Sequence, residues 1–98
     1  MQIKYRTKKI EKVCINASVA TKSYGSEMAF KIHLRIDQIS AANDVLELVN
    51  NSIGRCHALK GNKNGQYAMD LVHPYRLIFI VEDNQISVAE IQEIVDYH

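Results

Sequence analysis

The segment Tyr75-Arg76-Leu77-Ile78-Phe79-Ile80-Val81 is the most informative part of the sequence about the fold. Its β-branched and aromatic residues favour an extended chain, and only Arg76 interrupts the apolar run. Such a nearly continuous apolar run is typical of a strand in the middle of a sheet. Turns are predicted on either side of it, at His73-Pro74 and at Glu82-Asp83-Asn84-Gln85. The sequence therefore predicts a central strand over 75–81, with neighbouring strands before and after it.

Four further segments have the composition or the alternation of strands: residues 2–5, 55–59, 66–72 and a last segment that ends at Val95. Alternation is clearest in 66–72, where every second residue is apolar and large. The glycine-rich segment 60–65 joins two of these strands as a hairpin turn. Together with 75–81, these segments predict a strand meander in the second half of the chain.

The first half of the chain has helical rather than extended periodicity. Thr7 is suited to cap a helix that starts at Lys8, and Asn16 is suited to break this helix or to cap the next one. Gly25 is suited to the left-handed conformation that ends many helices. We therefore expect two short helices over 8–24.

A longer helix is predicted next, with Ser26 as its N-cap. Its apolar residues recur at helical spacing and form one core stripe: Met28, Ile32, Ile36 and Ile39. Phe30 and Leu34 lie on roughly the opposite side, where we expect them to meet the preceding helix. Contact with a protein partner is the alternative for these two residues. Asn43 or Asp44 starts a further short helix.

Helices followed by a strand meander predict an α+β fold. We expect the N-terminal helices to pack on one face of a mainly antiparallel sheet of four to five strands. The 98 residues are enough for one modest core, so we expect a single domain over 1–98.

The cysteines and the hydropathy of the chain exclude several classes of protein. Cys14 and Cys56 lie far apart, with no second pair of ligands nearby, so neither a zinc site nor a disulfide is expected. Nothing resembles a signal peptide, and no apolar run approaches the roughly 18 residues that span a bilayer. We expect a cytoplasmic protein that binds no membrane and no metal and needs no cofactor.

The net charge of +1 conceals an uneven distribution along the chain. Residues 1–35 contain eight basic and two acidic side chains, a local net charge of +6, and the remaining residues are acidic overall. A basic half suits a polyanion such as RNA, because phosphate binding releases counterions. A solvated helix face explains the same charges without a polyanion, and the sequence leaves both explanations open.

Several side chains that can move protons or bind phosphate fall on the predicted strands and at their ends. They are His57, Lys60, Lys63, Arg76, Asp96, Tyr97 and His98. Neighbouring strands lie about 4.8 Å apart, so such groups can converge on one face of a sheet. Histidines and cations without clustered carboxylates suit the cleavage of RNA without a metal. For residues 96–98, a polar end that frays is the alternative.

Arg76 is the most telling of these residues, because an unpaired charge within an apolar strand is very costly. On an open sheet face, its guanidinium can clamp a phosphate through two N–H groups. A salt bridge to Asp70 or Glu93 is the alternative explanation. For the segment 60–65, a hairpin turn is the main expectation and a phosphate contact is the second one.

Three segments are distinctive in combination: Cys56-His57-Ala58-Leu59-Lys60-Gly61, His73-Pro74-Tyr75-Arg76-Leu77 and the closing Ile94-Val95-Asp96-Tyr97-His98. The combination resembles the HigB-like plasmid-maintenance killer proteins, which are toxins of the RelE superfamily from type II toxin–antitoxin modules. The resemblance covers nearly the whole chain and is strongest from Ile53 onward. It implies a RelE-like fold and an endonuclease that cuts translated mRNA in the ribosomal A site. The implied partners are the ribosome with its mRNA and a helix-turn-helix, HigA-like antitoxin.

The resemblance also implies roles for individual residues. Matching positions assign catalysis to His57, Asp96, Tyr97 and His98, and phosphate contacts to Lys60 and Arg76, while Lys63 is a further cation of the turn. These residue types can take a proton from a ribose 2′-OH, which attacks the adjacent phosphorus, and can protonate the leaving 5′ oxygen. The sequence does not assign base and acid between the two histidines.

Two other functions fit parts of the sequence. ParE-like toxins, which inhibit gyrase, resemble these enzymes in fold but are not expected to need a histidine-bearing tail. A protein- or RNA-binding module without catalysis would use the tail, together with Phe30 and Leu34, to dock a partner. The presence of both His57 and His98 favours the ribonuclease.

Overall fold

A computed structural model describes residues 1–61 and 65–97 of the chain and confirms the expected α+β fold. The elements in chain order are β1 (Gln2–Tyr5), α1 (Lys8–Ile15), α2 (Ala17–Tyr24), α3 (Ser26–Ala41), α4 (Val45–Asn50), the short 3₁₀ helix η1 (Ile53–Arg55), β2 (His57–Ala58), β3 (Gln66–Asp70), β4 (Tyr75–Ile80) and β5 (Val88–Asp96).

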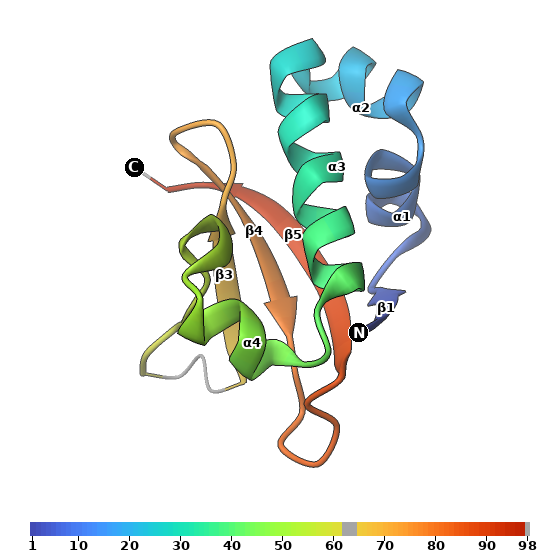
Figure 1. Ribbon diagram of the computed structural model, residues 1–98. Helices are drawn as coiled ribbons and strands as arrows, with labels where there is room; N and C mark the ends of the chain where they lie inside the picture. The colour runs from blue at the N-terminus through green and yellow to red at the C-terminus, as the bar shows by residue number, and fades with distance from the viewer. Residues whose placement is uncertain (62–64, 98) are drawn as a thin grey trace.

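Within the described residues, five strands form one mixed sheet in the order β1-β5-β4-β3-β2. β4 lies in the middle of the sheet, as its apolar sequence predicts. β1 runs parallel to β5, and the other neighbouring pairs are antiparallel. Helices α1, α2 and α3 lie together on one side of the sheet, and the C-terminal end lies near the turn between β3 and β4 (Figure 1). This end of the sheet carries the candidate site.

Side-chain caps explain where the first helices begin and end. The Thr7 hydroxyl accepts a hydrogen bond from the Ile10 amide, and the Asn16 side chain accepts from the second and third amides of α2. Gly25 follows the last residue of α2, as predicted, but its φ of 88° and ψ of 165° differ from the left-handed helical conformation that was expected, because the same residue also caps the start of α3. The prediction of Ser26 as the cap of α3 was wrong by one position, because Gly25 is the cap and Ser26 is already helical.

The core lies between α3 and the sheet. Met28, Ile32 and Ile39 of the predicted stripe are buried, and Ile36 packs partly against the same core. The expectation for Phe30 was wrong, because its side chain is 69% exposed and does not pack into the preceding helix. The buried residues at the start of α3 are its neighbours Met28 and Ala29, so Phe30 falls on the solvent side of the helix.

Two strands are shorter than predicted, for local reasons. The expected strand over 55–59 is reduced to His57–Ala58, because Arg55 has a φ of 54° and belongs to the η1 turn. The expected strand over 66–72 ends at Asp70, because the Leu71 amide bonds the Tyr75 carbonyl and closes the turn to β4. The last strand extends one residue past the predicted end, to Asp96.

Both cysteines are buried and free, in different parts of the core. Burial raises the pKa of each thiol from 9.0 to about 12, so both thiols are protonated at neutral pH. Among the described residues, no helix has the length and apolar character needed to cross a membrane.

Candidate active site on the open face of the sheet

The sheet has one face against the helices and one face without them. Leu77 and Phe79 of β4 pack in the core, so the alternating residues Arg76 and Ile78 point away from the helices. We call this second surface the open face. The pairing of the strands decides which polar side chains are neighbours on the open face.

Two rows of residues cross the open face. In the first row, Arg76 of β4 lies between Asp70 of β3 and Val95 of β5. In the second row, His57 of β2 is opposite Ala68, which is itself opposite Ile78. The sheet thus brings residues from four strands to one end of the open face.

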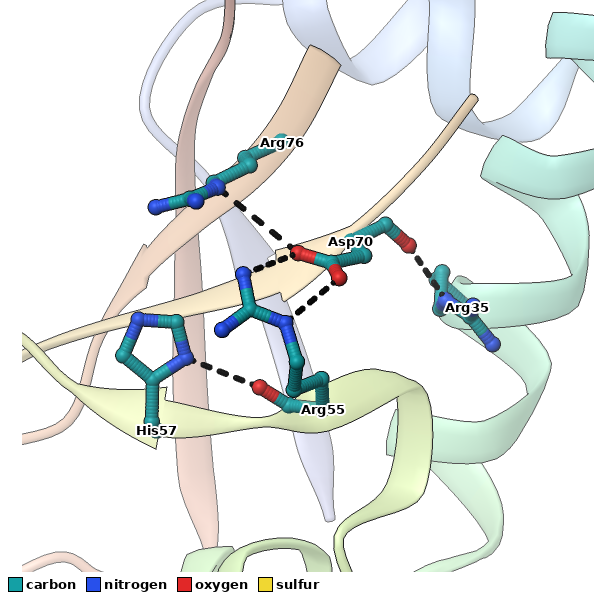
Figure 2. Close-up of polar contacts among 5 residues, drawn as sticks. All are labelled: Arg35, Arg55, His57, Asp70 and Arg76. Carbon is teal, nitrogen blue, oxygen red and sulfur yellow. Dashed lines mark hydrogen bonds and ion pairs between the residues drawn. The ribbon is translucent and has the colours of Figure 1, made fainter. Parts of the chain in front are cut away.

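Asp70 is the centre of the polar contacts at this end. Its carboxylate accepts two hydrogen bonds from Arg55, at 2.7 Å from Nε and 3.0 Å from Nη2. Arg76 Nε lies 3.6 Å from one carboxylate oxygen of the same residue. Figure 2 shows the two arginines reaching this carboxylate from the η1 turn and from β4. The hydrogen bonds from Arg55 hold the pKa of Asp70 below its ordinary value, despite partial desolvation.

A third arginine supports the main chain beneath this cluster. Arg35 of α3 donates a 2.7 Å hydrogen bond from Nε to the backbone carbonyl of Asp70, and its Nη1 donates to Gln38 (Figure 2). The guanidinium passes directly under Gly54, where an added Cβ would lie 2.7 Å from Arg35 Nε. A glycine at this position therefore allows the η1 turn to pack onto Arg35.

His57 is oriented by the turn that precedes it. Its Nδ1 lies 2.8 Å from the backbone carbonyl oxygen of Arg55 (Figure 2). A carbonyl oxygen only accepts hydrogen bonds, so Nδ1 must carry the proton and donate it. The neutral imidazole then has a free lone pair on Nε2, which is the atom that can accept a proton from a substrate.

The end of the chain is attached to this site. The Tyr97 amide donates a 3.0 Å hydrogen bond to the Pro74 carbonyl, which ties the residue after β5 to the turn between β3 and β4. Arg76 lies over the Tyr97 ring, with 4.7 Å between its guanidinium carbon and the ring centroid. This geometry is a cation–π contact. Asp96 is the last residue of β5, opposite Tyr75.

The predicted site residues fall into four groups. Asp96 forms the first group, because it is opposite Tyr75, whose ring packs against the core, and so lies on the helix side of β5. His57, Arg76 and Tyr97 lie at one end of the open face, and the salt bridge between Arg76 and Asp70, one of the two explanations weighed for this arginine, is present. Lys60 is exposed shortly after β2. Lys63 and His98 lie outside the described residues.

Arg35 and Arg55 were not among the predicted site residues. Arg55 was assigned to a strand, and no local pattern marks its left-handed backbone or its pairing with Asp70. The described residues contain no cluster of three histidine, cysteine or carboxylate side chains that could hold a metal ion. The described part of the site offers an imidazole, guanidinium groups, a carboxylate and a phenol.

A scan against protein-family models and a search of curated proteins both returned no match. Among solved structures, the YoeB–YefM complex from Staphylococcus aureus contains a chain that is 21% identical to this protein, with a TM-score of 0.65. The match covers 100% of this protein and 97% of the chain in that complex. The YoeB dimer from the same organism is also 21% identical over the same shares, with a TM-score of 0.55. A heterotetrameric YoeB–YefM toxin–antitoxin complex is 20% identical over the same shares, with a TM-score of 0.56.

The match spans both chains almost completely, so the likeness concerns the whole domain rather than a shared motif. The protein therefore has the RelE-like toxin fold seen in YoeB. At this level of identity, the likeness establishes the fold, and the chemistry has to be argued from the site.

Proposed function

We propose that this protein is the toxin of a type II toxin–antitoxin module and acts as a ribosome-dependent mRNA endonuclease. The observation that carries the proposal is that strand pairing places His57 and Arg76 on the same face of the sheet, with the Tyr97 ring against Arg76. An imidazole with an available Nε2 on the same face as positioned guanidinium groups suits attack on a phosphodiester. The fold supports the same class, because the YoeB structures include a toxin–antitoxin complex.

The proposed reaction uses the ribose 2′-OH of the mRNA as nucleophile. Nε2 of His57 takes the 2′-OH proton, a bond forms from O2′ to the adjacent phosphorus, and the bond from phosphorus to the 5′ oxygen breaks. The tail Asp96-Tyr97-His98 supplies the proton for the leaving 5′ oxygen. Arg76 offsets the charge that develops on the phosphoryl oxygens, and Lys60 and Lys63 bind the neighbouring backbone. The products are a 2′,3′-cyclic phosphate and a 5′-hydroxyl.

The exposure of the site supports the proposed dependence on the ribosome. His57 is half-buried and the side chain of Arg55 is 58% exposed, so the site is an accessible surface. Such a surface cannot by itself hold a flexible strand with its 2′-OH in line with the scissile bond. A decoding site that holds the mRNA codon in one conformation supplies the missing orientation.

The finer assignments of this proposal come from the resemblance to the HigB-like proteins. They are cleavage in the A site, inhibition of translation as the outcome, and a helix-turn-helix antitoxin as the silencing partner. A pull-down of the tagged protein with each of the two candidate antitoxin types, helix-turn-helix and YefM-like, tests the last assignment directly.

The deciding experiment is primer-extension mapping of mRNA ends in a purified translation system. The wild-type protein is compared with His57→Ala and with a reaction that lacks ribosomes. We expect cleavage in phase with codons only for the wild type with ribosomes. Intact mRNA in all three reactions would contradict the proposal, and a gyrase supercoiling assay on the same preparation would then test the ParE-like alternative.

A further inference from the structure

Arg55 has hydrogen-bonding capacity that its ion pair does not use. The Asp70 carboxylate occupies the side of the guanidinium formed by Nε and Nη2. A guanidinium has five N–H groups, and the other three, on Nη1 and Nη2, find no acceptor among the described residues. These N–H groups form the end-on fork that matches two oxygens of a phosphate.

The ion pair is too exposed to be explained by stability alone. The side chains of Arg55 and Asp70 are 58% and 36% exposed, and exposed ion pairs contribute little to folding. The backbone at Arg55 also has a φ of 54°, a left-handed conformation that is disfavoured for residues other than glycine. Such conformations persist where the surrounding structure requires a particular placement of the residue.

The same carboxylate also holds Arg76, so two guanidinium groups meet at one acceptor. Arg76 is positioned further by the Tyr97 ring, and Asp70 is positioned from below by Arg35. The Arg55–Asp70–Arg76 cluster therefore has a net charge of +1 and two guanidinium groups facing the same carboxylate. Asp70 reduces the repulsion between the arginines, which allows both to stay at the site before RNA is present.

We propose that Arg55 is a further RNA-binding residue of this site, and that Asp70 is the positioning residue that holds Arg55 and Arg76 as a two-arginine clamp for one phosphate. This inference rests on the proposed function and extends it. The bound group is a phosphodiester of the RNA backbone, either in the mRNA next to the cut or in ribosomal RNA. His57 is tied to the same residue through the Arg55 carbonyl, so the clamp and the proposed base are held in a fixed relation.

The test distinguishes the role of the Arg55 guanidinium from the role of the Arg55 backbone carbonyl. Arg55→Ala removes the guanidinium but keeps the carbonyl that orients His57, and Arg55→Lys keeps the charge but not the fork. Arg6, an exposed arginine next to β1, gives the matched control Arg6→Ala. For each variant, the toxin concentration at half-maximal cleavage is measured on ribosomes carrying mRNA, over a range of salt concentrations.

We expect Arg55→Ala to raise the half-maximal concentration about ten- to hundredfold, with the salt dependence reduced by about one phosphate contact. Arg55→Lys keeps the wild-type salt dependence but binds more weakly, and Arg6→Ala resembles the wild type. Asp70→Asn also weakens cleavage, although it makes the site more positive. Stronger cleavage by Asp70→Asn, or wild-type behaviour of Arg55→Ala, would overturn the inference.

Co-sedimentation with vacant ribosomes distinguishes the two sources of the phosphate. Weaker binding of Arg55→Ala to vacant ribosomes identifies ribosomal RNA, whereas a defect that appears only with mRNA identifies the message. If the wild type cleaves mRNA and Arg55→Ala cleaves it equally well, only the inference about the clamp is overturned. A wild-type protein that cleaves nothing overturns both the proposed function and the clamp.

Discussion

Asp70 organises the candidate site although it is not itself a group that attacks RNA. Its carboxylate holds Arg55 and Arg76, and its backbone carbonyl holds Arg35 from the helix side. One residue of β3 therefore connects the η1 turn, β4 and α3. A change at this position is expected to alter both acid stability and the arrangement of the cations.

The lowered pKa of Asp70 predicts a contribution to stability that depends on pH. A carboxyl group with a lower pKa in the folded state stabilises the protein above its ordinary value of 3.8, and this contribution is lost as the pH falls through the folded pKa. We expect urea unfolding of the wild type to lose more stability between pH 6 and pH 3 than that of Asp70→Asn. Equal losses in the two proteins would contradict this assignment.

His57→Ala is expected to lower the rate constant of mRNA cleavage by about 10²- to 10⁴-fold, the usual contribution of a general base. The fold should be unaffected, because the His57 ring makes its hydrogen bond to the adjacent turn and not to the core. Single-turnover cleavage on programmed ribosomes measures the effect. His33→Gln is the control, since His33 contacts the Val13 carbonyl between two helices and should leave the rate unchanged.

At the scale of single elements, the η1 turn shows how a short segment can depend on one glycine. Gly54 combines a φ of 57° with close contact to Arg35, whereas Gly25 has a φ of 88° and open space around it. Gly54→Ala therefore adds a clash to the backbone strain, and Gly25→Ala adds strain only. Gly54 has a ψ of 27°, in the αL region, whereas Gly25 has a ψ of 165°, in a region that is populated essentially by glycine alone. We therefore expect both substitutions to be destabilising, by about 1–3 kcal/mol each.

Urea unfolding of both alanine variants measures these costs directly. Because the clash displaces Arg35 from the Asp70 carbonyl, Gly54→Ala should also reduce cleavage in the fraction that remains folded. An added Cβ at Gly25 meets open space and contacts none of these arginines, so the folded fraction of Gly25→Ala should have normal activity. Normal cleavage by Gly54→Ala would show that Arg35 moves aside without losing its bond to the Asp70 carbonyl.

Helix α3 offers a second comparison within one element. Ile32 is completely buried and Phe30, two residues earlier, is 69% exposed. Ile32→Ala is expected to cost about 2–5 kcal/mol because it leaves a cavity, and Phe30→Ser is expected to change stability by less than about 0.5 kcal/mol. Thermal or urea unfolding of both variants checks this. A large loss for Phe30→Ser would mean that the ring packs against the protein after all.

At the scale of the whole molecule, the two buried thiols predict how the protein responds to alkali. The pKa of Cys14 and of Cys56 is about 12 in the folded state and 9.0 ordinarily, so the unfolded chain loses protons first as the pH rises. The stabilisation is complete below pH 9 and is lost as the pH rises through the folded values. We expect about 1 kcal/mol per thiol to be lost by pH 10.

Urea unfolding at pH 8 and pH 10 tests this prediction. A Cys14→Ala, Cys56→Ala double variant is the control, and its stability should fall less over the same interval. The double variant will be less stable at both pH values, because both side chains are buried in the core, so the difference between the two pH values is the quantity to compare. An equal decline in both proteins would contradict the assignment to the thiols.

The positive charge of the N-terminal segment is distributed over the helix side of the molecule. Lys8, Lys9 and Lys12 are exposed on α1, whose buried residues face the core, so these lysines do not join the arginines of the open face. The N-terminal lysines therefore do not strengthen RNA binding at the candidate site, which has to depend on the cations of the open face itself.

Local signals in the sequence were sufficient for most of the secondary structure. Thr7, Asn16 and Gly25 mark helix ends through their own side chains or backbone freedom, and the apolar run of β4 predicts its central place. Alternation also predicted that residues of separate strands would share one face. Each of these features depends on neighbours within a few positions, which a single sequence displays.

The clamp at Asp70 was decided only by the tertiary structure. Arg55 pairs with a residue 15 positions away, and Arg35 reaches the same residue across 35 positions and from the other layer of the fold. Their placement depends on the left-handed η1 turn and on the packing of α3 beneath it. Such contacts leave no periodic pattern, because they join residues that meet only after the helices and the sheet have packed.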